Sequence, residues 1–377
     1  MTRLNAHPLA SALLASMLTG GGLVALDWHN SPRLVVATIS PVEAPALDGD
    51  ISDEAWHAAR PVRVLTSHGG DFGGSGQSRI TVRAVQDGSD LYMALEWEDP
   101  TRSLEFLPLV KDAGVWRALE TGVATASEAR FFDDRIAVML ANPGVALIGG
   151  GIHLGARPLE GGPASTTGRG LHYTGPGSFV DLWQWHAALG AVTTRVEDGY
   201  IGAPKPPSAA EMAGQARYLG GIGLDDPARP VAMSNVVPAP EDGARAVEPV
   251  YLPWAGTGTV ADIRADEGLS DADEPGRVWA VRASAAKPHS PEVDARFADG
   301  SVVPGVFVDD SVDLGPQDVT ARGAWAGGRW VLEIRRSLAP GEHDIAFADG
   351  TMLWFAAFDH SQTRHTYHLR PLIVEMR

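Results

Sequence analysis

The stretch DLWQWH at residues 181–186 places its two tryptophans at alternate positions and ends on a histidine. Successive side chains of a β-strand point to opposite faces of the sheet. Trp183 and Trp185 therefore share one face, and His186 ends the other. The pattern predicts a strand with two indoles on one side and a titratable imidazole on the opposite side.

Other apolar runs of strand length surround this stretch and are separated by turn residues. Residues 79–85 and 91–97 flank an Asp87-Gly88 dipeptide, which is typical of a tight β-hairpin. Trp325 and Trp330 enclose a second turn rich in glycine. Long amphipathic helical patterns are scarce, so we expect an all-β protein built as an immunoglobulin-like antiparallel β-sandwich.

The chain of 377 residues is expected to form one sandwich domain over residues 46–377, preceded by a linker over residues 28–45. Between residues 202 and 275 prolines recur at short intervals and interrupt regular structure. A structureless segment of that length is uncommon in a compact domain. We therefore expect a long irregular, Pro-rich insertion at about residues 202–275 that packs over the sandwich or lies against a partner.

The N-terminal segment favours an attachment to a membrane. No Asp, Glu, Lys or Arg occurs in residues 4–26, and a helix of that length, at about 1.5 Å per residue, covers a hydrocarbon core of about 30 Å. Arg3 precedes the run and Asp27 follows it, so the positive-inside rule places the N-terminus in the cytoplasm. Residues 1–27 are expected to be a single-pass anchor in a bacterial inner membrane, with the bulk of the chain in the periplasm. A signal peptide is the alternative.

Composition limits the partners and the chemistry. The formal net charge of −17 argues against nucleic acid as a partner, because such a surface repels phosphate. The chain has no cysteine, which excludes disulfides, thiolate metal sites and covalently attached haem. No hydrolase, kinase or zinc-protease motif is present, so enzymatic activity is not expected. No metal other than haem iron is assigned from the sequence.

Several motifs together resemble the haem-binding family related to the gamma subunit of ethylbenzene dehydrogenase, a DOMON-like β-sandwich. Residues 47–56 (LDGDISDEAW) are similar to the opening of these sandwiches, an opening shared with some carbohydrate-binding modules. Residues 97–101 (WEDPT) are similar to a family hairpin end. Residues 181–186 are similar to its D-L-W-x-W-K signature, and residues 328–334 and 355–359 to its closing strands.

The resemblance implies a haem b held between a Met and a Lys, in a subunit that relays electrons for a molybdenum enzyme. His186 stands at the Lys position here, and His with Met is a normal pair of haem ligands. Met139 is the candidate for the second ligand, with Met93 as the alternative. Trp183 and Trp185 are candidates to stack on a porphyrin or a sugar. Each of these residues has a structural alternative: a hydrogen-bonded strand end for His186 and core packing for the others.

Two functions follow from these expectations. In the first, the chain is a non-catalytic periplasmic subunit of a respiratory or photosynthetic membrane complex that binds other subunits and the bilayer and relays electrons through haem b. Alternatively, it is a haemless structural subunit that stabilises such a complex, for example a photosynthetic reaction centre. A carbohydrate-binding module is a third reading, which depends on fold analogy alone.

Overall fold

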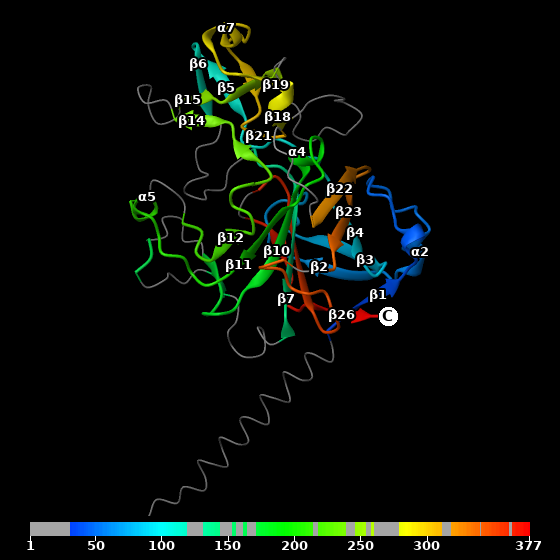
Figure 1. The fold of residues 1–377 in the computed structure, drawn as a ribbon. Helices are drawn as coiled ribbons and strands as arrows, with labels where there is room; N and C mark the ends of the chain where they lie inside the picture. The colour runs from blue at the N-terminus through cyan, green and yellow to red at the C-terminus, as the bar shows by residue number, and fades with distance from the viewer. Residues whose placement is uncertain are drawn as a thin grey trace, which may run out of the picture.

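The protein is described from a computed structural model. The structure describes residues 31–118, 131–143, 153–155, 161–163, 171–213, 218–238, 246–253, 258–259, 279–310, 318–339, 341–361 and 364–377. Figure 1 shows a body of long strands with a smaller lobe of short strands at one end. The all-β expectation is confirmed, because the described helices are short turns.

One sheet of 13 strands forms the body, in the order β12-β11-β10-β7-β24-β26-β1-β3-β4-β23-β22, with β2 beside β3 and β25 beside β24. The strands are β1 (Arg33–Thr38), β2 (Val62–Thr66), β3 (Ser78–Gln86), β4 (Asp90–Glu98), β7 (Arg135–Ala141), β10 (Val180–His186), β11 (Glu197–Ile201), β12 (Ile222–Leu224), β22 (Val319–Trp325), β23 (Arg329–Ser337), β24 (Met352–Phe358), β25 (Thr366–Tyr367) and β26 (Leu372–Met376).

The sheet folds over on itself to make a sandwich. Inward-facing side chains of β3, β4 and β23 pack in one apolar cluster with those of β7, β10 and β24. The two ends of the sheet also meet, because the backbone N–H of Ala321 on β22 donates to the carbonyl of Thr194, just before β11. Burial of this shared interior stabilises the body.

Strand β1 lies at the centre of the sheet and corrects two expectations. It pairs in parallel with both neighbours, with Val36 opposite Met376 of β26 and Ala84 of β3. The sheet is therefore not wholly antiparallel. Residues 28–45 are also not simply a linker, because they contain this strand, and its Leu34 is fully buried. The sequence Arg-Leu-Val-Val-Ala-Thr carries the β-branched residues that a central strand favours.

Both expected hairpins are confirmed. β3 and β4 pair antiparallel across a turn in which Gly88 has a φ of +93°, a conformation that favours glycine. β22 and β23 pair with Trp325 opposite Trp330. The ring of Trp330 continues into an aromatic cluster, 6.0 Å from Trp97 and 5.2 Å from Trp185 between ring centroids. These indoles fill the middle of the sandwich.

A separate lobe of short strands lies beyond one end of the body (Figure 1). Its apolar centre contains Leu109, Trp116, Leu252 and Phe297. Its strands are β5 (Leu109–Asp112), β6 (Val115–Ala118), β13 (Met233–Ser234), β14 (Val236–Pro238), β15 (Val247–Pro249), β16 (Tyr251–Pro253), β17 (Gly258–Thr259), β18 (Val281–Arg282), β19 (Ala286–Pro288), β20 (Ser301–Val303) and β21 (Val306–Val308).

The lobe corrects the expected insertion at residues 202–275. The segment is not wholly irregular, because its described residues include short strands at 222–224, 233–234, 236–238, 247–249, 251–253 and 258–259, and β12 joins the main sheet. The lobe also takes β5 and β6 from far earlier in the chain, since β5 pairs with β20. The remaining elements are η1 (Pro41–Glu43), α2 (Ala55–Ala58), β8 (His153–Gly155), β9 (Leu171–Tyr173), α4 (Ala187–Gly190), α5 (Ala209–Met212), η2 (Ala283–Ala285) and α7 (Pro291–Asp294).

The proposed anchor at residues 1–27 lies outside the described residues. Among the residues that the structure describes, no helix has the length and apolar character needed to cross a bilayer.

Candidate functional site

His186 ends β10 inside a buried group of charged side chains. Its Nδ1 lies 3.3 Å from Oδ1 of Asp133, and its Nε2 lies 3.5 Å from Oε2 of Glu197. Arg135, opposite His186 in the β7–β10 register, lies 3.7 Å from the same Asp133 oxygen. Both ring nitrogens of His186 therefore face carboxylates, and the imidazole is held between two strands and the loop before β7.

The carboxylates decide the charge of this imidazole. Burial disfavours the protonated ring, but Asp133 and Glu197 outweigh it and raise the pKa of His186 above its usual range. Asp133 also accepts a hydrogen bond of 3.0 Å from the N–H of Ala188 at the start of α4. The group joins the end of β10, the start of β7 and the short helix. This arrangement is a structural network of the kind that fixes a strand end.

The two methionine candidates lie on different faces of the sheet. Met139 of β7 is opposite Leu182 of β10 and packs with Ile201 and Met352 in a cluster outside the sandwich interior. It shares a face with His186, four residues further along the strands, or about 13 Å at roughly 3.3 Å per residue. Met93 is fully buried in the sandwich interior.

Trp183 and Trp185 both point into the sandwich interior, on the face of β10 opposite His186. Trp185 packs edge-on against Trp330, and the guanidinium of Arg336 lies 5.1 Å from the ring centroid of Trp183. The two indoles are core residues. They do not lie beside His186, so they cannot stack on a group that His186 would bind.

The arrangement does not fit a haem held by His186 and Met139. An iron ligand needs a ring nitrogen with a free lone pair, whereas both nitrogens of His186 are engaged by Asp133 and Glu197. The surroundings of the ring are charged, apart from the ring of Phe106 at 5.2 Å between centroids. A porphyrin site is mostly apolar. Iron binding would require His186 to leave one of its carboxylate partners.

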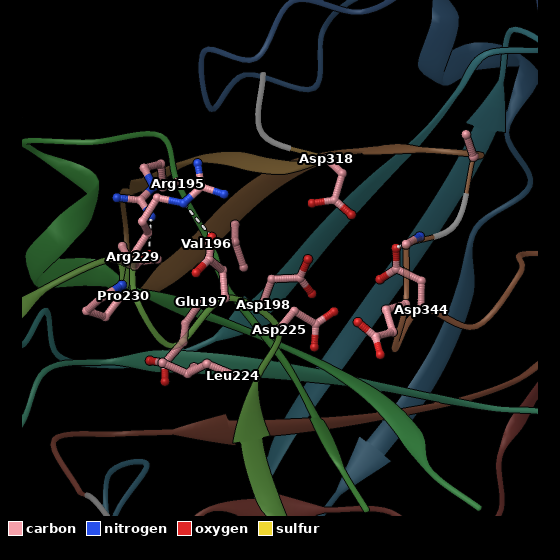
Figure 2. A pocket seen from close by; sticks show the side chains of 15 residues that line it. Arg195, Val196, Glu197, Asp198, Leu224, Asp225, Arg229, Pro230, Asp318 and Asp344 are labelled. Carbon is pink, nitrogen blue, oxygen red and sulfur yellow. Dashed lines mark hydrogen bonds and ion pairs between the residues drawn. The ribbon is translucent and has the colours of Figure 1, made fainter. Parts of the chain in front are cut away.

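A cleft of about 410 Å³ opens beside this network and is strongly acidic (Figure 2). Its lining contains seven carboxylates and two arginines, Arg195 and Arg229. The lining residues are Arg195, Val196, Glu197, Asp198, Leu224, Asp225, Asp226, Arg229, Pro230, Val231, Asp318, Ala339, Gly341, Glu342 and Asp344. They come from β11, from the end of β12 and the loop after it, from the start of β22 and from the loop after β23. The excess of negative charge favours cationic groups.

Asp344 of the cleft lining and Asp181, a buried residue outside that lining, converge on a buried arginine. Nη2 of Arg336 lies 3.1 Å from Oδ2 of Asp181 and 3.2 Å from Oδ1 of Asp344. One oxygen each of Asp181, Asp198 and Asp344 lies within 4.8 Å of the others. Burial raises the pKa of Asp181 to about 8, although Arg336 acts in the opposite direction. Burial also raises the pKa of Asp198 to about 9, with a further contribution from Asp318.

Sequence reasoning identified Asp181 only as part of a motif and missed the cleft and the acids beside it. These acids are separated by up to 163 residues in the chain, from Asp181 to Asp344. Local spacing carries no sign that they meet. The available signal was the position of Asp181 on the same face as Trp183, where an unpaired carboxylate is costly and needs a partner.

Comparison with known proteins confirms the resemblance. The model of the family described as "Ethylbenzene dehydrogenase" matches residues 53–370. No curated protein sequence matches the chain. Among solved structures, a family 9 carbohydrate-binding module from Caldicellulosiruptor kristjanssonii in complex with glucose shares 7% identity, with 92% of this chain and 95% of that chain covered at a TM-score of 0.32. A putative carbohydrate-binding protein from Bacteroides uniformis shares 7% identity, with 92% and 100% covered at a TM-score of 0.34.

Proposed function

The chain belongs to the ethylbenzene dehydrogenase family, and from this premise we propose that it is a haemless, non-catalytic subunit of an electron-transfer membrane complex. Its role is association: residues 4–26 anchor it in a bacterial inner membrane, and the sandwich stands in the periplasm. It stabilises a respiratory or photosynthetic assembly rather than turning over a substrate.

The engagement of His186 carries this proposal. The residue at the family's Lys position has both nitrogens against carboxylates, 3.3 Å from Asp133 and 3.5 Å from Glu197. A ligand that relays electrons through iron must instead offer a lone pair to the metal. The observed network supports a position that has been converted from a metal ligand to a structural link.

The acidic cleft supports association with a positively charged partner segment. Its rim includes Asp226 and the exposed Glu342, and the whole chain carries a formal charge of −17. Complementary charge steers and selects protein partners more than it adds affinity. We therefore expect a basic segment of a neighbouring subunit to enter this cleft.

The haem question is decided by an absorption spectrum of the full chain purified after expression with excess haem. We expect no Soret band. A Soret band that shifts on reduction and disappears in His186→Ala, but persists in a matched His57→Ala variant on the exposed helix α2, would refute the haemless assignment and establish the relay.

The association role is tested by a charge reversal at the rim of the cleft. Glu342→Lys should weaken retention of the tagged chain in the membrane complex, measured by co-sedimentation in detergent at low salt. Glu54→Lys is the control, because Glu54 is an exposed acid outside the cleft lining, on the segment that enters α2. Equal retention of both variants would argue against the cleft as the contact surface.

A further inference from the structure

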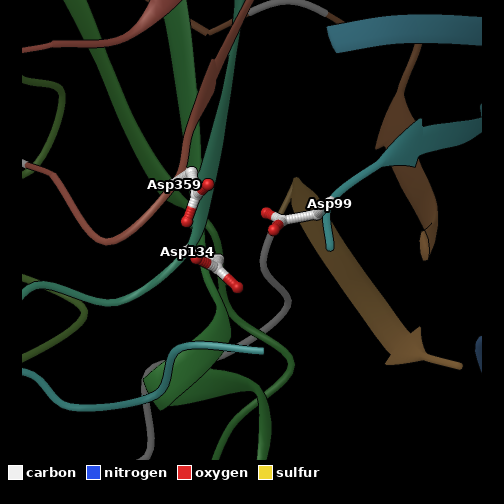
Figure 3. Close-up of side chains that lie close together, drawn as sticks. All are labelled: Asp99, Asp134 and Asp359. Atoms are coloured by element: carbon white, nitrogen blue, oxygen red, sulfur yellow. The ribbon is translucent and has the colours of Figure 1, made fainter. Parts of the chain in front are cut away.

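A second group of carboxylates is buried at another place in the sandwich (Figure 3). Asp99 follows β4, Asp134 precedes β7 and Asp359 follows β24, and all three have an exposed fraction of 0%. One oxygen of each lies within 4.8 Å of the others. Figure 3 shows the three side chains directed toward one another. Chain segments from both halves of the sandwich thus bring acids to one point.

Asp99 supplies an oxygen with nothing to bond. Its Oδ1 accepts from the N–H of Thr101 at 3.2 Å, whereas its Oδ2 has no hydrogen-bond partner among the described residues. Burial raises the pKa of Asp99 to about 11, with further contributions from the charges of Asp134 and Asp359. A buried carboxylate oxygen without a partner is costly. Because Asp99 is directed toward Asp134 and Asp359 (Figure 3), a cation bound among the three would satisfy this carboxylate.

The other two carboxylates are held in fixed orientations. Asp134 accepts hydrogen bonds from the N–H of Ser103 at 2.8 Å and from the indole of Trp330 at 3.0 Å. Asp359 accepts from the N–H of Phe72 at 2.6 Å. These bonds leave further lone pairs on each carboxylate. Such outer contacts are what orient the ligands of a metal ion.

One histidine does not balance the charge. Nδ1 of His360 lies 2.6 Å from Oδ1 of Asp359, and its Nε2 lies 3.0 Å from the carboxylate of Asp71. His360 therefore shares its single positive charge with an acid outside the cluster. The carboxylates around Arg336 also have oxygens without a hydrogen-bond partner among the described residues, on Asp181, Asp198 and Asp344, but there Arg336 lies between Asp181 and Asp344 and supplies a positive charge.

We propose that Asp99, Asp134 and Asp359 bind a calcium ion that joins the two halves of the sandwich. Ca²⁺ takes six to eight oxygen ligands at about 2.3–2.6 Å, so oxygens around one ion lie at most about 5 Å apart. Carboxylate oxygens that lie within 4.8 Å of one another can reach one such ion, and Ca²⁺ accepts irregular coordination where Mg²⁺ demands a near-ideal octahedron. The all-oxygen donor set disfavours zinc and copper. The hydroxyl of Thr101, 3.3 Å from Asp359, and water complete the shell.

The test uses the full chain, stripped with a chelator and unfolded by heat at pH 7.5 while tryptophan fluorescence is recorded. Calcium chloride should raise the melting temperature by several degrees in a saturable manner, and the same concentration of magnesium should raise it much less. Terbium should bind at the same place, with luminescence sensitised by Trp330 and displaced by calcium.

Asp99→Asn is the decisive variant, because no described hydrogen bond depends on its Oδ2. It should fold, melt above the stripped wild-type chain because Asn does not have to take up a proton on folding as the buried Asp99 carboxyl does, and no longer respond to calcium. Asp198→Asn in the cleft is the control and should respond like the wild type. Absence of a calcium response in the stripped chain, an unchanged response in Asp99→Asn, or its loss in Asp198→Asn would each overturn the proposal.

Discussion

Replacing Arg336 by methionine should destabilise the protein strongly and in a pH-dependent manner. Arg336 has an exposed fraction of 1% and bridges the carboxylates of Asp181 and Asp344. It also donates a hydrogen bond of 2.9 Å to the carbonyl of Ile345. Methionine fills a similar volume but leaves both carboxylates without their counter-charge. Breaking a buried ion pair on one side typically costs about 3–5 kcal/mol of unfolding free energy.

The pH dependence follows from the direction of the pKa shifts. Burial raises the pKa of Asp181 to about 8 in the folded chain, from an ordinary value of 3.8. A raised acid pKa contributes stability that is present at low pH and is lost as pH rises through the folded pKa. Without Arg336 this pKa rises further. The cost of the substitution should therefore be smaller near pH 5 and grow as pH rises above about 8.

The measurement is urea unfolding at pH 5 and pH 8.5, followed by tryptophan fluorescence. Arg335→Met is the matched control on the same strand, because Arg335 is about half exposed and pairs with Asp90 at 3.1 Å. Exposed pairs contribute roughly 0–1 kcal/mol, so this variant should lose little at either pH. If Arg336→Met costs no more than Arg335→Met at pH 8.5, the buried ion pair is not stabilising and the reasoning is wrong.

Three further predictions follow from the packing. Gly323→Ala should cost about 1–3 kcal/mol of unfolding free energy, because an added Cβ would lie 2.6 Å from the ring of Trp185; a double-mutant cycle with Trp185→Phe should recover part of it, and strict additivity would contradict the clash. His186→Asn should cost about 1–3 kcal/mol near pH 6 in urea unfolding. The cost should shrink as pH rises through the raised pKa of His186, and an unchanged cost would contradict the network with Asp133. Gly88→Ala should lower the unfolding free energy by about 1–2 kcal/mol, because of its φ of +93°, and a neutral result would contradict that turn.

The sequence predicted the parts of the fold that short-range patterns control. Alternation at residues 181–186 placed Trp183 and Trp185 on one face of a strand, and the structure has both in the core. The Asp87-Gly88 turn gave the β3–β4 hairpin. The expectation for β1 failed because its strand character depends on two parallel partners, one of them β26 at the opposite end of the chain.

The charged groups could not be predicted in the same way. Asp133 and Asp134 are adjacent acids in the sequence, and both are fully buried. They serve different partners, since Asp133 faces His186 and Asp134 accepts from Trp330. Which partner each acid meets depends on how the two halves of the sandwich close. The spacing of residues along the chain does not show which acids become neighbours when the two halves of the sandwich pack together.

The three carboxylate groups described above differ in how their charge is balanced. Asp133 lies beside both His186 and Arg135, and Asp181 and Asp344 share Arg336. The cluster around Asp99 has the imidazole of His360 close to it and an oxygen without a partner. Protonation can remove the charge of this third group. At a pH above the ordinary pKa of an acid, however, keeping a buried carboxyl protonated lowers the unfolding free energy. Asp99 has a higher raised pKa than Asp181, about 11 against about 8, so in calcium-free buffer its cost to the unfolding free energy continues to grow to a higher pH.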